Sequence, residues 1–79
     1  MRLDKYLKIS RLIKRRTVAN EACDGGRVTV NGTVAKASRE IKPGDRIEIR
    51  FGANHTCVEV VSVAENVSKS DAPAMYREV

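Results

Sequence analysis

The spacing of apolar residues changes once along this 79-residue chain, at the glycine pair Gly25–Gly26. Before the pair, apolar residues recur every three or four positions, which is the spacing of one face of a helix. After it they alternate with polar residues, which is typical of half-buried strands. A chain of this length forms one domain, so both halves must share one core. The sequence therefore predicts an α+β fold in which two short N-terminal helices pack on a small antiparallel β-sheet.

The first helix is predicted from Arg2 to Ile9, with an apolar face opposite a basic one. The second runs from about Arg15 to Asp24, and the glycine pair after it allows the left-handed conformation that ends many helices. Both helices are expected to contribute apolar side chains to the core, and the connection between them adds two more. These residues are Leu3, Tyr6 and Leu7, then Leu12 and Ile13, then Val18, Ala19, Ala22 and Cys23.

The strands begin with a hairpin. Val28 and Val30 point to one side, and the Asn31–Gly32 pair that follows is the strongest short-range hairpin signal. A second turn is predicted over Lys42–Asp45, because proline and glycine occupy its centre. It leads into an alternating strand over Arg46–Phe51.

A break over Gly52–Asn54 separates that strand from a last one, predicted over Cys57–Val63. The domain is accordingly expected to occupy residues 1–63, and residues 64–79 to form a polar C-terminal tail. Met75 and Tyr76 are the large apolar residues of this tail. They could dock on the sheet or on a partner, and both alternatives stay open at this point.

Positive charge is concentrated at the N-terminus. Residues 1–16 hold seven of the fifteen basic residues and only one acidic residue, Asp4, whereas residues 17–79 carry a net charge of −1. A local basic field suits a polyphosphate partner, because neutralising phosphates releases condensed counterions. Lys14, Arg15 and Arg16 also precede or open the second helix, where free backbone N–H groups attract anions. This concentration of charge predicts RNA as the partner, while DNA and an anionic membrane surface stay open as alternatives on charge alone.

Other kinds of site have little support in the sequence. Cys23 and Cys57 form no CxxC pair and His55 is the single histidine, so no metal and no cofactor is expected. The two cysteines are better explained as reduced, partly buried thiols than as a disulfide, since no signal peptide indicates an oxidising compartment. No apolar run approaches the roughly 20 residues that span a bilayer, and a cytoplasmic protein is expected.

No arrangement of nucleophile and base suggests an enzyme. The three aspartates near predicted helix ends and turns are explained by those positions. They are Asp4, Asp24 and Asp45.

Four motifs in order resemble the S4 RNA-binding domain. They are Arg2–Leu7, Lys14–Thr17, Gly26–Gly32 and Lys42–Asp45. Within that superfamily the chain is similar to the RqcP family of bacterial ribosome-associated quality control, whose members are also called heat-shock-protein-fifteen homologues. Arg50–Gly52 and Met75–Tyr76 extend the similarity over nearly the whole chain.

The resemblance implies an αL-type motif in which two helices present a basic surface to structured RNA. It further implies binding to large-subunit rRNA and peptidyl-tRNA on stalled, split ribosomes, in support of a factor that adds alanine without mRNA. The family's RNA contacts match Arg2 and Arg16, and RNA binding is expected also of Lys5, Arg11, Lys14 and Arg15. The free protein is expected to be a monomer. A general heat-shock-type binder of dissociated large subunits, with no role in tailing, is the alternative. With Tyr6 in the core and Phe51 on the sheet, recognition of RNA shape is expected rather than of unpaired bases.

Overall fold

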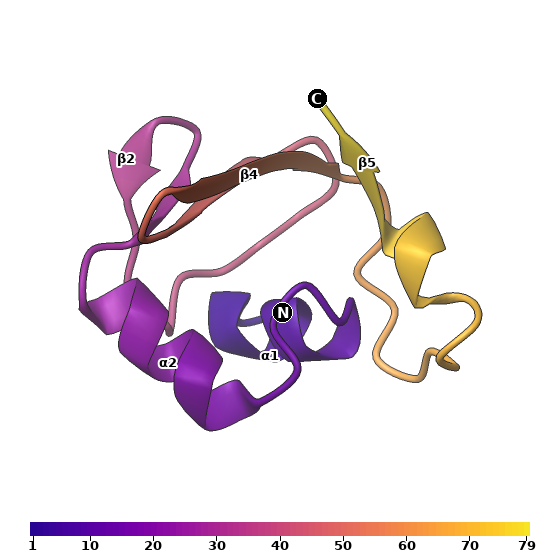
Figure 1. Cartoon of the computed structure of the whole chain (residues 1–79). Coiled ribbons are helices and arrows are strands. Elements are labelled where there is room, and N and C mark those ends of the chain that lie inside the picture. The colour runs from indigo at the N-terminus through magenta and orange to yellow at the C-terminus, as the bar shows by residue number, and fades with distance from the viewer.

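The computed structural model describes residues 1–79 and places two helices on one face of a five-stranded antiparallel sheet (Figure 1). Helix α1 spans Leu3–Ile9 and helix α2 spans Arg16–Asp24. The strands are β1 (Val28–Val30), β2 (Thr33–Val34), β3 (Arg46–Phe51), β4 (Asn54–Val60) and β5 (Tyr76–Glu78), and a short 3-10 helix, η1 (Ala72–Met75), precedes β5. Their order across the sheet is β2-β1-β3-β4-β5. The predicted fold class is confirmed.

The core lies between the helices and the sheet. Helix α1 contributes Leu3, Tyr6 and Leu7, all fully buried, and α2 contributes a strip of small residues, Ala19, Ala22 and Cys23. The sheet contributes every second residue of its strands, Val28, Val30, Ile47, Ile49, Val58 and Val60. The prediction for Val18 was wrong, because its side chain lies at the edge of the α2 arc and is 40% exposed. Ile13 is buried and Leu12 packs against the same core.

The start of α1 is fixed by the segment that joins β2 to β3. The backbone N–H groups of Leu3 and Asp4 donate to the carbonyls of Arg39 (2.8 Å) and Ala37 (3.2 Å). The N-terminal ammonium donates to Glu40 at 2.6 Å, and Ile41 donates back to the Met1 carbonyl. Backbone groups that a helix terminus normally leaves unpaired are thus bonded to the chain itself.

Both predicted turns form where glycine permits positive φ. Asn31 and Gly32 have φ of 53° and 85°, the signs that a type I′ hairpin turn requires. Gly44 has φ of 95° within the Lys42–Asp45 turn. The buried Asp45 carboxylate closes this turn, because it accepts hydrogen bonds from the Lys42 backbone N–H (3.0 Å) and the Asn31 side chain (3.1 Å).

Strand β4 starts and ends earlier than the predicted Cys57–Val63. Gly52 adopts φ of 56°, so the chain reverses within two residues and Asn54 already pairs with Phe51. The predicted break over three residues was therefore too long. At the other end the backbone N–H groups of Val61 and Ser62 both donate to the Met75 carbonyl, which takes them out of the β3–β4 ladder.

The C-terminal residues return to the same sheet. Strand β5 pairs with β4, and the Met75 side chain is 2% exposed within the core. The hydroxyl of Tyr6 donates to the Met75 carbonyl at 2.7 Å, which ties α1 to the end of η1. Of the two alternatives left open by the sequence, docking on the sheet is the one observed. The boundary predicted at residue 63 falls just after β4 in the structure.

Replacing Tyr6 by Phe removes this buried hydroxyl and should loosen the C-terminal strand. The Met75 carbonyl keeps its bonds from Val61 and Ser62, so we expect a loss of about 1 kcal/mol in unfolding free energy. Amide hydrogen exchange should accelerate in β5 before it does in β3. Equal protection of β5 in Tyr6→Phe and the parent chain would contradict this role.

Candidate nucleic-acid interface

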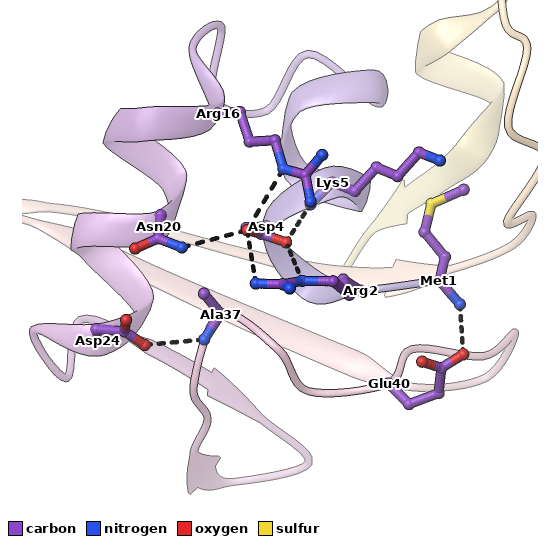
Figure 2. A network of polar contacts seen from close by, with 9 residues as sticks. All are labelled: Met1, Arg2, Asp4, Lys5, Arg16, Asn20, Asp24, Ala37 and Glu40. Carbon is purple, nitrogen blue, oxygen red and sulfur yellow. Dashed lines mark hydrogen bonds and ion pairs between the residues drawn. The ribbon is translucent and has the colours of Figure 1, made fainter.

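Asp4 lies where α1 meets α2, and its carboxylate accepts hydrogen bonds from both helices and from the residue that precedes α1 (Figure 2). Its side chain is only 2% exposed. Oδ1 accepts from the Lys5 backbone N–H at 2.8 Å and from Nε of Arg2 at 3.2 Å. Oδ2 accepts from Arg2 Nη2 (3.3 Å), Arg16 Nε (3.4 Å) and the Asn20 amide (3.3 Å). Asp4 was expected only to favour the start of a helix, and the structure shows that it also links the two helices.

This carboxylate is ionised at neutral pH. Burial by itself would raise the pKa of Asp4, but the hydrogen bonds from Asn20, Arg2 and the Lys5 backbone, together with the charge of Arg16, lower it below its usual value. A buried charge is tolerated only when it is paired and hydrogen-bonded. Asp4 therefore requires the arginines, and the arginines are oriented by Asp4.

Arg2 and Arg16 consequently lie side by side at the surface. Each side chain is 48% exposed, and Arg16 uses only Nε on Asp4, so both of its terminal amino groups lack a protein partner. A hollow of about 450 Å³ lies over the pair, lined also by Thr17, Asn20 and Glu21. The lining consists of polar and charged groups without any apolar side chain.

The remaining cations continue from this hollow along α1. Arg16 also lines a second hollow with Lys5 and Lys8, and Lys8 lines a third with Arg11 and Lys14. Because adjoining hollows share a residue, the cations form one continuous surface. We call this the helical basic surface, consisting of Arg2, Lys5, Lys8, Arg11, Lys14 and Arg16.

Two of the predicted residues differ from the others. Lys5 donates to Glu65 at 2.9 Å, and that hydrogen bond lowers the pKa of Glu65, so the positive charge of Lys5 is locally offset. Arg15 is the residue before α2 and lines none of the three hollows. No side chain caps α2, and Ala19 is the first of its residues whose backbone N–H finds a protein acceptor. The start of α2 therefore adds free N–H donors to the positive charge.

Three residues of this region were absent from the predicted set: Lys8, Thr17 and Asn20. Lys8 follows Arg2 and Lys5 at intervals of three, and Asn20 lies one helical turn after Arg16, so helical spacing could have identified both. Thr17 offers no such signal.

The helical basic surface offers groups of the kind that suit an anion. Its groups are hydrogen-bond donors with fixed or flexible positive charge. Burial, with the charges of Asp4 and Asp24, raises the pKa of the nearby Cys23 thiol to about 11, so that thiol stays protonated. Both cysteines are free. No helix in the structure has the length and apolar character of a membrane span.

Comparison with known proteins assigns the family. The S4 domain model matches residues 1–47. The chain belongs to the S4 domain family. An RQC P-site tRNA stabilizing factor of Halalkalibacterium halodurans is 57% identical to this S4 protein over 96% of this chain and 86% of its own length. The protein of that name from Bacillus subtilis is 51% identical over 96% of this chain and 88% of its own length.

A solved structure shares the fold of the whole chain. The trimeric heat shock protein 15 of Vibrio cholerae superposes on this S4 protein with a TM-score of 0.91 and 31% identity, covering 100% of this chain and 81% of that one. The resemblance to the S4 domain, inferred from four ordered motifs, is confirmed. The resemblance to the RqcP family, inferred from the extension of the match over nearly the whole chain, is confirmed as well.

Replacing Asp4 by Asn should destabilise the fold in a pH-dependent way. At pH 7 the neutral amide cannot balance Arg2 and Arg16, and we expect a loss of about 1–3 kcal/mol in unfolding free energy. Because the pKa of Asp4 is lowered by folding, its contribution is present above the ordinary value of 3.8 and disappears as pH falls below it. Urea unfolding of both proteins between pH 7 and pH 3 measures this.

The exposed Glu78, which forms no ion pair, provides the matched control. Glu78→Gln removes the same charge and should leave the unfolding free energy within about 0.5 kcal/mol of the parent. If the difference in unfolding free energy between Asp4→Asn and the parent chain stays constant over the whole pH range, the role of the carboxylate is contradicted.

Proposed function

We propose that this chain is an RNA-binding accessory factor of ribosome-associated quality control. In this role it binds the rRNA of the large ribosomal subunit and the peptidyl-tRNA of stalled, split ribosomes, and it supports mRNA-independent C-terminal alanine tailing. The observation that carries the proposal is the arginine pair, Arg2 and Arg16, held at the surface by one buried carboxylate. The name of the relatives, RQC P-site tRNA stabilizing factor, supplies the RNA partner.

The geometry suits the phosphate backbone of folded RNA. Guanidinium groups can bind two phosphate oxygens at once, and a rigid fork loses less freedom on binding than a mobile one. Asp4 holds one edge of each arginine and leaves the other edge for a ligand. Lys8, Arg11 and Lys14 extend the positive potential beyond the pair, which favours a partner longer than a single phosphate.

Shape, rather than base sequence, is the feature that such a surface can recognise. Unpaired bases are usually bound by stacking on exposed aromatic rings. Tyr6 is fully buried, while Phe51 and Tyr76 are half-buried against the core. The helical basic surface therefore has charge and forked donors but no stacking platform, as expected for recognition of a double-helical backbone.

The proposed role is binding without a chemical step of its own. Holding peptidyl-tRNA on the large subunit prolongs the time in which an alanine-tailing factor can act, and that requires only binding free energy. In this role the chain works in the cytoplasm and is a monomer before it meets its RNA partners.

A second candidate function is a general heat-shock-type binder of dissociated large subunits, independent of tailing. The similarity to heat shock protein 15 of Vibrio cholerae, at a TM-score of 0.91, supports it. Both functions use the same surface and differ in the partner that acts next.

Arg2→Ala and Arg16→Ala should each weaken co-sedimentation with large ribosomal subunits. Each change removes one phosphate-binding group, so the slope of log affinity against log salt should fall by about one. Arg39→Ala is the matched control, because Arg39 is exposed and lines none of the three hollows. If Arg39→Ala weakens binding as much as Arg2→Ala does, affinity depends on net charge alone, and the assigned site is contradicted.

Asp4→Asn distinguishes the effect of arginine orientation from the effect of net charge. The variant is one charge more positive than the parent chain, so net charge predicts tighter binding of a structured RNA hairpin. Loss of the carboxylate that orients Arg2 and Arg16 predicts weaker binding. We expect weaker binding, measured at a temperature where circular dichroism shows the variant folded. Tighter binding would overturn the positioning role.

The role in tailing predicts a cellular outcome. In cells that lack this chain, a stalled reporter should lose most of its alanine tails, and the parent chain should restore them while Arg2→Ala/Arg16→Ala does not. Mass spectrometry of the reporter measures the tails. If the tails are normal in cells without the chain, and the parent chain nevertheless binds free large subunits, the heat-shock-type alternative is favoured.

A further inference from the structure

The face of the sheet that points away from the helices is also basic. Figure 1 shows α1 and α2 on one face of the sheet and no helix on the other. In β3, Ile47 and Ile49 are buried, so the residues that alternate with them, including Arg46 and Arg50, point to the outer face. Arg27 immediately precedes β1 and reaches the same side.

These three arginines surround one hollow of about 380 Å³. All three are exposed, and the side chains of Arg27 and Arg46 form neither a hydrogen bond nor an ion pair. Arg50 donates from Nε to Glu48 at 3.2 Å, and its terminal amino groups have no protein partner. Like Arg16, Arg50 is thus bound to a carboxylate through Nε alone.

We infer that this hollow, the outer basic surface of Arg27, Arg46 and Arg50, binds the phosphate backbone of a second RNA segment. The inference deepens the proposed function, on which it rests for the nature of the ligand. It assigns to the sheet a contact separate from the helical basic surface.

The charge at the hollow favours an anion. Its one carboxylate, Glu48, is already paired with Arg50 and with His55 Nε2 at 2.6 Å. The three guanidinium groups therefore meet no unpaired negative charge within the lining. Three arginines around one paired glutamate leave a net positive hollow.

The lining also favours nucleic acid over an acidic protein segment. Only Val34 and Cys57 are apolar, so the hollow lacks the apolar centre typical of protein interfaces. Gly26 and Gly32 stand at its edge with open space above them, which allows close approach of a bulky backbone. The Thr29 hydroxyl adds a neutral group that can bond a phosphate or a ribose.

The two basic surfaces lie on opposite sides of the core, because the helices cover the inner face of the sheet. The molecule measures 28 × 24 × 24 Å. Two RNA segments bound to these surfaces would therefore be separated only by the thickness of one small domain. A single domain could thereby connect two RNA segments without any movement of its own.

Binding of a structured RNA hairpin to the Arg2→Ala/Arg16→Ala background tests the second surface. Residual, salt-dependent binding should remain there. Adding Arg27→Gln, Arg46→Gln and Arg50→Gln should lower it at least about tenfold and reduce the salt slope by about three. The matched control changes three other exposed cations that line no hollow, Lys36, Arg39 and Lys69, to Gln. Circular dichroism melts verify that every variant is folded.

Failure of the proposed function and failure of this inference give different results. If Arg2→Ala/Arg16→Ala binds RNA as the parent chain does, the helical site of the proposed function is wrong. If the control triple weakens residual binding as much as the arginine triple does, or neither weakens it, the outer basic surface is not an RNA site. Preferential binding of poly-glutamate over the hairpin, lost in the arginine triple, would identify an acidic protein as its partner and overturn the inference.

Discussion

The carboxylate of Asp4 is the interaction on which the helical half of this protein depends. A buried, ionised carboxylate costs several kcal/mol unless donors surround it. Here the donors come from Arg2 before α1, from the Lys5 backbone within it, and from Arg16 and Asn20 of α2. The same carboxylate therefore ties α1 to α2, beside their apolar contacts, and orients the two arginines. Stability and ligand geometry cannot be separated at this position.

The sheet and the C-terminus hold α1 in place from the opposite side. Tyr6 bonds to the Met75 carbonyl, while the segment joining β2 to β3 bonds to the first turn of α1. A helix of seven residues is too short to be stable alone. Its position is set by these contacts at both ends, so the helical basic surface is a product of the whole fold rather than of the N-terminal segment alone.

Local rules predicted most of the fold. Helical periodicity placed α1 and α2 to within one residue at their starts, and Asn31–Gly32 placed the first hairpin, because these signals depend on neighbours in sequence. The limits of β4 and the course of residues 72–79 were not predictable in the same way. They depend on pairing between β4 and β5 and on the Met75 carbonyl, which are contacts between residues far apart in the chain. The same reason explains why Asp4 was assigned only a helix-end role, since its partner Asn20 lies sixteen positions away.

The net charge of a sequence segment does not predict the charge of the surface that the segment forms. Residues 17–79 carry a net charge of −1, which indicated that positive charge was confined to the N-terminus. In three dimensions several of the acids are occupied elsewhere: Glu40 pairs with the N-terminus, Glu65 with Lys5, and Asp45 is buried in a turn. Strand alternation meanwhile gathers Arg46 and Arg50 on the outer face of β3. A segment that is nearly neutral in composition thus presents a basic surface, because each strand sorts its residues between two faces.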